Sequence, residues 1–403
     1  MGTSGPRMVG MHANIIIPSM HIGIDARLYG TYGRGIGQYL KHLIAELERL
    51  DAENEYTVFV SKQGWREYQP TNPHFHKKMV DIRLYTLKEQ LLLPWIIFRK
   101  HIDLMHFPHF TVPLFTKQPF VMTIHDMIIH KFPTEYATHH SHAMYRLKLW
   151  GYRLTLARAI KRARHIIAVS NHTRDDILSY YPHAQKKCSV IHEGVAQVNP
   201  VAQEVQHAYL NRLHLVSHHY LFYIGAAYPH KNLSAMIQGY MMACDTDPTI
   251  ATYPFIIAGR QDVFHSQLEQ LVCTTYPDIH SRIQWIGEIT DEERSILYAN
   301  ATFFMYITCY EGFGLPVLEA MSHGTPVLIS DRGSLQEIAE DAAVRVSPDH
   351  PKDIAHTIVR CLSHPDVLSE YARRGIHRAT QFSWRTTGQQ TIECYQQIFN
   401  SKQ

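Results

Sequence analysis

Glu311-Gly-Phe-Gly-Leu-Pro-Val-Leu-Glu319 is the stretch that decides the fold of this 403-residue chain. It follows the apolar run Ala301–Tyr306 and leads into a helical pattern, so we expect a strand, a tight turn and a helix in that order. Pro316 suits the first turn of a helix, where its missing N–H costs no hydrogen bond. Such strand–turn–helix units build parallel sheets, which bind ligands at the turns that follow their strands.

The turn in this stretch has the chemistry of a site for anions and hydroxyl groups. The backbone N–H groups of Phe313, Gly314 and Leu315 lie at the start of the predicted helix, where the helix dipole is positive. The two glycines of the turn allow a ligand to approach the backbone closely. Glu311 and Glu319 flank the turn, and each carboxylate can accept two hydroxyl hydrogen bonds, as the vicinal diols of a sugar or ribose require.

Outward from this stretch, the chain alternates short apolar strands with helical patterns. The expected strands of the first half are His21–Ile24, Tyr56–Val60, Asp103–His106, Phe120–Ile124, His165–Val169 and Ser189–His192. Those of the second half are Tyr220–Ile224, Pro254–Ala258, Ile283–Trp285, Ala301–Tyr306 and Pro326–Ile329. This alternation predicts an α/β protein with two doubly wound parallel-sheet domains, residues 20–198 and 199–383. Residues 1–19 lack the pattern and are expected to form a poorly ordered extension.

The composition is that of a globular protein. Charged residues make up 19% of the sequence, and the apolar run Leu91–Phe98 is far shorter than the ~20 residues that span a bilayer. The helix expected at Lys88–His101 has consecutive apolar residues rather than one apolar face, which favours a buried helix over an interfacial one. The six cysteines form no C-x-x-C pair, and His139, His140 and His142 lack partners at ligand spacing, so we expect no metal site.

The net charge of +3 is unevenly distributed between the halves of the chain. Residues 1–200 carry 25 Lys and Arg against 15 Asp and Glu, whereas residues 201–403 carry 14 against 21. A basic first half is compatible with an anionic partner, such as nucleic acid, a membrane surface or a phosphorylated substrate. It is equally compatible with a chance distribution over two solvated surfaces.

Glu311 and Glu319, with seven residues between them that include a Gly-Phe-Gly-Leu-Pro core, resemble the E-x7-E signature of glycosyltransferase family 4. The resemblance extends over nearly the whole chain from Met20, through Gly33-Arg-Gly-Ile-Gly37, His125-Asp126, Val169-Ser-Asn171, His192-Glu-Gly-Val195, Gly225–Asn232 and Gly324-Thr-Pro-Val327. It implies the GT-B fold, in which two Rossmann-like domains face a cleft and a C-terminal helix, here residues 384–403, crosses back to the first domain. It also implies retaining transfer from a nucleotide-sugar donor, without a metal ion or other cofactor.

The resemblance assigns roles to particular residues. Lys231 matches a lysine that contacts the donor diphosphate, a role that suits a mobile point charge at a strand-to-helix turn. His125 ends a predicted strand and matches a histidine beside the transferred sugar. We therefore expect His125, Lys231 and Glu311 to be catalytic, with Glu311 holding hydroxyls of the donor sugar and Glu319 the ribose. Phe313, Gly314 and Leu315 are expected to bind the donor through their N–H groups.

The glycine-rich loop Gly33-Arg-Gly-Ile-Gly37 matches a family loop beside the donor sugar and diphosphate. Gly35 and Gly37 are therefore donor-binding candidates, although a plain tight turn explains such glycines equally well. The sequence departs from the family at Ala226, where many members carry an arginine after the strand-end glycine. One phosphate contact is therefore missing, or is supplied by Arg260 or His230.

The sequence therefore predicts a retaining glycosyltransferase that moves a hexose from a nucleotide-diphosphate sugar to a hydroxyl of a growing glycan or lipid-linked acceptor. The loops look like those of bacterial mannosyltransferases that build cell-surface polysaccharide, which favours GDP-mannose as donor, with UDP-glucose next. The expected location is cytoplasmic, with a possible peripheral contact at the inner face of the membrane.

Three alternatives remain open at this level. A nucleotide-sugar epimerase could use the same fold and would need no acceptor. A non-catalytic binding subunit could keep the fold without turnover, although Glu311, Glu319, Lys231 and His125 are all present. A nucleic-acid binder would suit the basic first half, but no helix-turn-helix or aromatic stacking motif accompanies it, so we expect no nucleic-acid partner.

Overall fold

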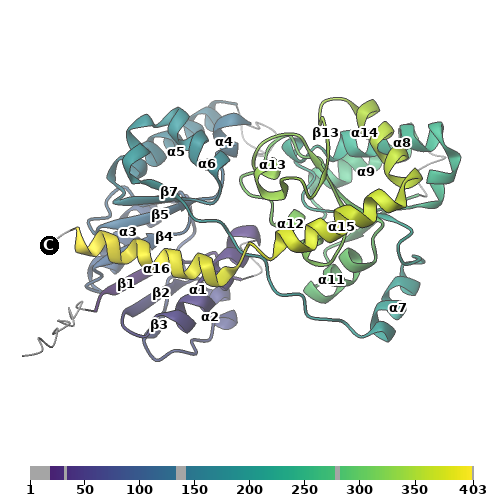
Figure 1. Cartoon of the computed structure of the whole chain (residues 1–403). Helices are drawn as coiled ribbons and strands as arrows, with labels where there is room; N and C mark the ends of the chain where they lie inside the picture. Colours follow the sequence, from purple (N-terminus) through teal and green to yellow (C-terminus); the bar gives the residue numbers. More distant parts are fainter. Residues whose placement is uncertain (1–18, 31–33, 133–141, 277–281, 402–403) are drawn as a thin grey trace, which may run out of the picture.

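The structure is a computed structural model that describes residues 19–30, 34–132, 142–276 and 282–401. The predicted extension before residue 19, Gly33, His139 and His140 lie outside the described residues. The chain forms two parallel-sheet domains that lie side by side, and its last helix passes from the second domain to the first (Figure 1). The predicted fold class is therefore confirmed.

The first domain is built on a seven-stranded parallel sheet with the order β3-β2-β1-β4-β5-β6-β7. Its strands are β1 (His21–Ala26), β2 (Glu55–Val60), β3 (Phe75–Met79), β4 (Leu104–Phe107), β5 (Phe120–Ile124), β6 (His165–Ala168) and β7 (Cys188–Val190). Its helices are α1 (Arg34–Leu50), α2 (Lys62–Glu67), α3 (Leu87–Phe98), α4 (Ile128–Lys131), α5 (His142–Arg162) and α6 (Asn171–Tyr180). All sheet pairs are parallel, so the turns after the strands lie along one edge.

The second domain is built on a six-stranded parallel sheet with the order β10-β9-β8-β11-β12-β13. Its strands are β8 (Leu221–Ile224), β9 (Phe255–Ala258), β10 (Ile283–Gly287), β11 (Phe303–Tyr306), β12 (Val327–Ser330) and β13 (Val344–Val346). Its helices are α7 (Gln203–Arg212), α8 (Leu233–Thr246), α9 (Val263–Thr275), α11 (Asp291–Asn300), α12 (Leu315–Ser322), α13 (Ser334–Ala339), α14 (Pro351–Ser363) and α15 (Pro365–Ala379). Aromatic and branched residues of β8, β9, β11 and β12 are buried on both faces, as a sheet covered twice requires.

The C-terminal helix α16 (Trp384–Asn400) returns to the first domain and packs against α1 (Figure 1). Trp384, Ile392, Tyr395 and Ile398 are buried in the same apolar cluster as the central strands of the first sheet. The hydroxyl of Tyr395 lies 2.6 Å from Nδ1 of His106, a buried residue of β4. The predicted crossover helix is therefore confirmed, and it is part of the first domain's core.

The prediction that the helix at Lys88–His101 is buried was wrong for half of its surface. Leu93 and Ile97 of α3 are buried, but the side chains on the other face are largely solvent-exposed, namely Leu87, Leu91, Leu92, Trp95 and Phe98. Consecutive apolar residues in a helix point all round its axis, so their pattern does not indicate which face will be exposed. No helix in the described part of the chain is both long and apolar enough to cross a bilayer.

Candidate active site

Lys231 and Glu311 form an ion pair at the edge of the second sheet where its strands end. Lys231 ends a single 3-10 turn after β8, and Glu311 follows β11. The Lys231 Nζ lies 2.9 and 2.8 Å from the two carboxylate oxygens, and 3.1 Å from the hydroxyl of Tyr306. Burial disfavours the charge on Lys231, but Glu311, Tyr223 and Asp126 together outweigh burial and raise the pKa of the amine above its ordinary value. Two predicted catalytic residues are thus in contact.

The helix after Glu311 begins as predicted. Gly314 precedes Leu315 at the start of α12 with φ = +117°, a conformation that favours glycine. A Cβ at Gly314 would lie 2.5 Å from Leu335, so the position also has no room for a side chain. The Phe313 ring is buried against Phe382, which leaves only its backbone for a ligand. These features support the N–H groups at 313–315, rather than the side chains, as donor-binding groups.

Glu319 lies on α12, and its side chain faces α11. The hydroxyl of Tyr298 donates to its Oε2 at 3.2 Å, and the Nε of Arg294 lies 3.6 Å from the same oxygen. Burial raises the pKa of the Glu319 carboxyl, although Arg294 partly opposes this shift. Arg294 thus adds a cation beside the expected ribose-binding carboxylate. The sequence analysis missed it, because only helix packing brings α11 and α12 together.

The turn that carries the two glutamates is pressed against the first domain. A Cβ at Gly312 would lie 1.8 Å from the carbonyl oxygen of His125, so any larger residue would push the domains apart. The Gly312 carbonyl accepts hydrogen bonds from the hydroxyls of Ser170, at 2.6 Å, and Thr173, at 3.0 Å. Ser170 is also the N-cap of α6, since its side chain accepts from the Thr173 N–H. The carboxyl edges of both sheets therefore meet at this turn.

His125 follows β5 at this meeting point, and its ring is held by the first domain. Its Nδ1 lies 2.8 Å from Oε1 of Glu193, and its Nε2 lies 3.2 Å from the carbonyl oxygen of Pro108. The adjacent Asp126 accepts a hydrogen bond from the Ile128 N–H, and burial raises the pKa of its carboxyl. Asp126 therefore bonds the backbone after it, whereas Glu193, which the sequence analysis did not select, orients the imidazole.

The glycines of the α1 loop divide into two kinds. Gly37 is buried, and a Cβ there would lie 2.0 Å from the carbonyl oxygen of Gly30, so chain packing by itself requires glycine. Gly35 is exposed at the start of α1, with open space where a Cβ would lie. Gly35 is therefore the better placed of the two predicted donor-binding glycines.

A replacement for the arginine missing at 226 is available nearby. A Cβ at Gly259 would lie 2.1 Å from the Gly225 carbonyl oxygen, so the turns after β8 and β9 touch, and Ala226 and Arg260 directly follow these two glycines. Arg260 is solvent-exposed. His230 is mostly buried, and burial lowers its pKa to about 4. Arg260 is therefore the better candidate for a second cation near a diphosphate.

One more polar group, beside the end of β1 in the first domain, was not predicted from the sequence. Arg27, just after β1, is buried and pairs with Asp25 at 2.7 Å and with Glu89 at 2.6 Å. A small hollow beside this group is lined by Asp25, Arg27, Leu28, Ile36, Leu40, Leu84, Pro108, His109 and Thr111.

Among the residues that the structure covers, no His, Cys, Asp and Glu side chains gather in a group able to hold a metal ion.

Glu337 of α13 ties the two domains together. Its carboxylate accepts from the backbone N–H groups of Asn171 and His172 at the start of α6, and from Nε2 of His192 at 2.9 Å. Burial opposes ionisation of this carboxyl, but the hydrogen bonds from His192, Asn171 and His172 outweigh burial and lower its pKa to about 2. A carboxylate at a helix N-terminus is also favoured by the helix dipole.

Glu337→Gln should therefore lower the free energy of unfolding at pH 7 by about 1–3 kcal/mol. A carboxyl whose pKa is lowered in the folded protein stabilises the fold fully at pH values above its ordinary pKa of 4.5. This stabilisation is lost as the pH falls towards 2. The difference between the two proteins, measured by urea unfolding at pH 7, 5, 4 and 3, should thus shrink in acid. Glu292→Gln is the control, because Glu292 is a solvent-exposed carboxylate of α11. A difference that stays constant with pH would contradict this account.

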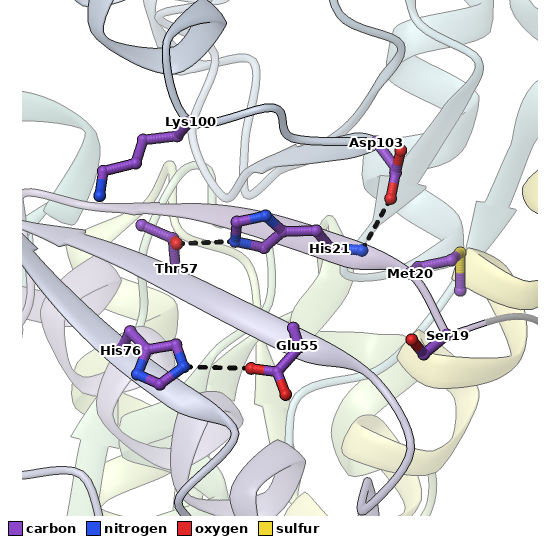
Figure 2. Close-up of a pocket in the computed structure, with 8 residues that line it drawn as sticks. All are labelled: Ser19, Met20, His21, Glu55, Thr57, His76, Lys100 and Asp103. Atoms are coloured by element: carbon purple, nitrogen blue, oxygen red, sulfur yellow. Dashed lines mark hydrogen bonds and ion pairs between the residues drawn. The ribbon is translucent and has the colours of Figure 1, made fainter.

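A larger hollow, about 370 Å³, lies at the opposite edge of the first sheet. Figure 2 shows its lining: Ser19, Met20, His21, Glu55, Thr57, His76, Lys100 and Asp103. His21 bonds Thr57 and Asp103, and His76 bonds Glu55. Because these residues come from the amino ends of β1, β2 and β3, the hollow is far from the strand ends where such sheets bind ligands.

Comparisons with known proteins agree with this geometry. A family model described as Glycosyltransferase Family 4 matches residues 33–197, and one described as Glycosyl transferases group 1 matches residues 218–364. O-antigen chain mannosyltransferase B of Escherichia coli is 31% identical over 324 residues, which are 78% of this chain and 79% of that protein. O-antigen chain mannosyltransferase RfbU of Salmonella typhimurium is 26% identical over 353 residues, 85% of this chain and 91% of that protein.

Solved structures support the fold. Anabaena Alr3699/HepE in complex with UDP and glucose has a TM-score of 0.71 at 16% identity, over 93% of this chain and 98% of that one. WaaG, titled as a glycosyltransferase of lipopolysaccharide biosynthesis, has a TM-score of 0.69 at 13% identity, over 92% and 98%. Because these sequence identities are low, the two solved structures show only that the fold is shared.

Proposed function

The chain belongs to glycosyltransferase family 4, and from that premise we propose that it transfers mannose, with glucose as second choice, from a nucleotide-diphosphate sugar to a hydroxyl of a glycan or lipid-linked acceptor. It is a hexosyltransferase with a role in polysaccharide synthesis. The observation that carries the proposal is the Lys231–Glu311 pair beside the start of α12. The next residue, Gly312, contacts the backbone of His125. Mannose is favoured because the two O-antigen relatives are named mannosyltransferases.

In the proposed reaction, the bond between the sugar's anomeric carbon and the diphosphate breaks, and a bond to the acceptor oxygen forms on the same face. The acceptor's proton passes to the departing phosphate oxygen. Negative charge grows on the diphosphate as it leaves, so Lys231 and the N–H groups at the α12 start stabilise the transition state. Because these groups supply the positive charge, the proposal requires no metal ion, and transfer should be insensitive to EDTA.

Donor binding must change the partners of the Lys231–Glu311 pair. Lys231 would move from the carboxylate to a phosphate oxygen, and Glu311 would accept hydroxyls of the sugar instead. Glu319 would hold the ribose, with Arg294 beside it. Exclusion of water by the approach of the two domains would protect the donor from hydrolysis.

The nucleotide is identified by measuring thermal stability with GDP, UDP, ADP and dTDP. A nucleotide present at about a hundred times its dissociation constant should stabilise the protein by ~2.7 kcal/mol. Glu319→Ala should abolish the shift, because it removes the ribose acceptor. Glu340→Ala is the control, since Glu340 is an exposed carboxylate of the same domain. Stabilisation by none of the four would argue against a donor site here.

We further propose that the first domain works on the membrane that carries the acceptor, at its cytoplasmic face. Besides the exposed apolar residues of α3, the first domain exposes Phe115 and four apolar residues of α5, namely Met144, Leu147, Trp150 and Leu154. The two helices are linked here, since Leu114 bonds Gln90 of α3 and Arg162 of α5. Lys88, Arg99, Lys100, Lys117, Arg146 and Lys148 add the positive charge that anionic lipids attract.

Trp95→Glu should weaken binding to vesicles of anionic phospholipid by about tenfold or more, since it removes a large apolar side chain and adds repulsion. Trp95 is 56% exposed, so its replacement should leave the fold intact. Co-sedimentation with vesicles measures the change. Val263→Glu, at a site 53% exposed in the second domain, is the matched control. Equal binding of both variants and the parent protein would refute the membrane surface.

A further inference from the structure

Glu193 is a buried carboxylate fixed where the chain passes between the domains. Its side chain is 5% exposed. The neighbouring Gly194 has no room for a Cβ, which would lie 2.1 Å from the Trp384 nitrogen at the start of α16. Val195 then donates its N–H to Phe382. The backbone on the C-terminal side of Glu193 is therefore held by the crossover segment, and the carboxylate has little freedom to move.

The hydrogen bonds of His125 indicate which protons its ring carries. Nδ1 faces the Glu193 carboxylate at 2.8 Å, and Nε2 faces the Pro108 carbonyl oxygen at 3.2 Å. An ionised carboxylate and a carbonyl can only accept, whereas a neutral imidazole has a single N–H to donate. Both bonds are satisfied when the ring is an imidazolium that donates from both nitrogens.

Glu193 is the charged partner of the His125 ring. In the described part of the chain, His125 is the only basic side chain that forms an ion pair with Glu193. Burial lowers the pKa of both His106 and His109 to about 3, with a further contribution from the charge on His125. These two histidines are therefore neutral. The remaining titratable neighbours are Asp126, next in the chain, and Tyr39 of α1, whose ring packs edge-on against the imidazole.

This imidazolium lies beside the turn that the proposed function assigns to the donor. The His125 carbonyl touches Gly312, which directly follows the Glu311 that pairs with Lys231. We propose, on the basis of that function, that Glu193 is a positioning residue for sugar transfer. It keeps the His125 ring in one orientation and doubly protonated, so that Nε2–H can leave the Pro108 carbonyl and donate to an oxygen of the bound donor.

The protonation of the ring is tested without any substrate. In protein labelled with 15N-histidine, the His125 signals are identified by their loss in His125→Ala. At pH 7, both ring nitrogens should show the shifts of an imidazolium in the parent protein, and Glu193→Gln should convert the ring to the neutral form. Glu55→Gln, which removes the exposed carboxylate that pairs with His74, should leave the His125 signals unchanged. A neutral His125 in the parent protein would overturn the proposal.

The positioning role is tested by kinetics with GDP-mannose and UDP-glucose, followed as release of the nucleoside diphosphate. Glu193→Gln should lower kcat by about tenfold to a hundredfold with little change in KM, and Glu193→Asp should retain part of the activity. In a His125→Ala background, Glu193→Gln should cause no further loss, whereas additive losses would refute the role. If neither donor is turned over, the proposed function fails, and the ring signals still decide the protonation.

Discussion

Lys231→Met should reduce sugar transfer by about a hundredfold to a thousandfold, the usual effect of removing one group that stabilises charge in a transition state. Lys231 is the one side chain of this site that combines a fixed positive charge with a position at the end of β8, where a diphosphate would lie. The loss should appear mainly in kcat, because the charge on the leaving group develops only as the bond breaks. Release of nucleoside diphosphate from the donor measures it.

This variant also leaves Glu311 without its cation, and a loss of stability must be separated from a loss of catalysis. The Glu311 side chain is 14% exposed, so its unpaired charge should lower the melting temperature. The double variant Lys231→Met with Glu311→Gln should recover stability and stay inactive. Lys77→Met is the control, since Lys77 is held by the Trp65 and Tyr68 carbonyls of the first domain, away from the site. Near-normal kcat in Lys231→Met would remove Lys231 from the mechanism.

Ending the chain at Phe382 should unfold the protein, the largest effect on stability that we expect. The deletion removes Trp384, Ile392, Tyr395 and Ile398, all buried in the core of the first domain. Burial of such side chains contributes roughly 1.5–3 kcal/mol each. The sum, about 6–12 kcal/mol, is comparable to the whole stability of a typical domain, ~5–15 kcal/mol. Circular dichroism and the soluble yield of the truncated chain measure the outcome.

Two further variants make this prediction specific. A chain that ends at Phe399 keeps the buried residues of α16 and should melt within a few degrees of the parent protein. Tyr395→Phe removes the hydroxyl that lies 2.6 Å from His106 and should cost about 1–3 kcal/mol, because it leaves a buried imidazole nitrogen without its partner. A truncated chain that folds and transfers sugar would show that α16 is dispensable.

Some helices, strands and turns could be predicted from the sequence and others could not, for a physical reason. The turn after β11 and the start of the helix that follows it depend on residues a few positions apart, and the sequence predicted their structures. β3 was missed because its sequence, Phe-His-Lys-Lys-Met, has the polar residues of an edge strand. α7 and α15 were missed too, because each buries only a few apolar side chains.

The sequence by itself determined the two parallel-sheet domains, the turn between Glu311 and Glu319, and the residue types of a nucleotide-sugar site, because strand and helix periods and turn chemistry are local. Only the tertiary structure decided which of these residues meet. Lys231 and Glu311 are 80 residues apart in the chain, and His125 and Glu193 are 68 apart. Likewise, one apolar face of α3 is exposed because no element among the described residues covers it. Such contacts depend on how separate elements pack, and packing between distant segments leaves no periodic signal in a single sequence.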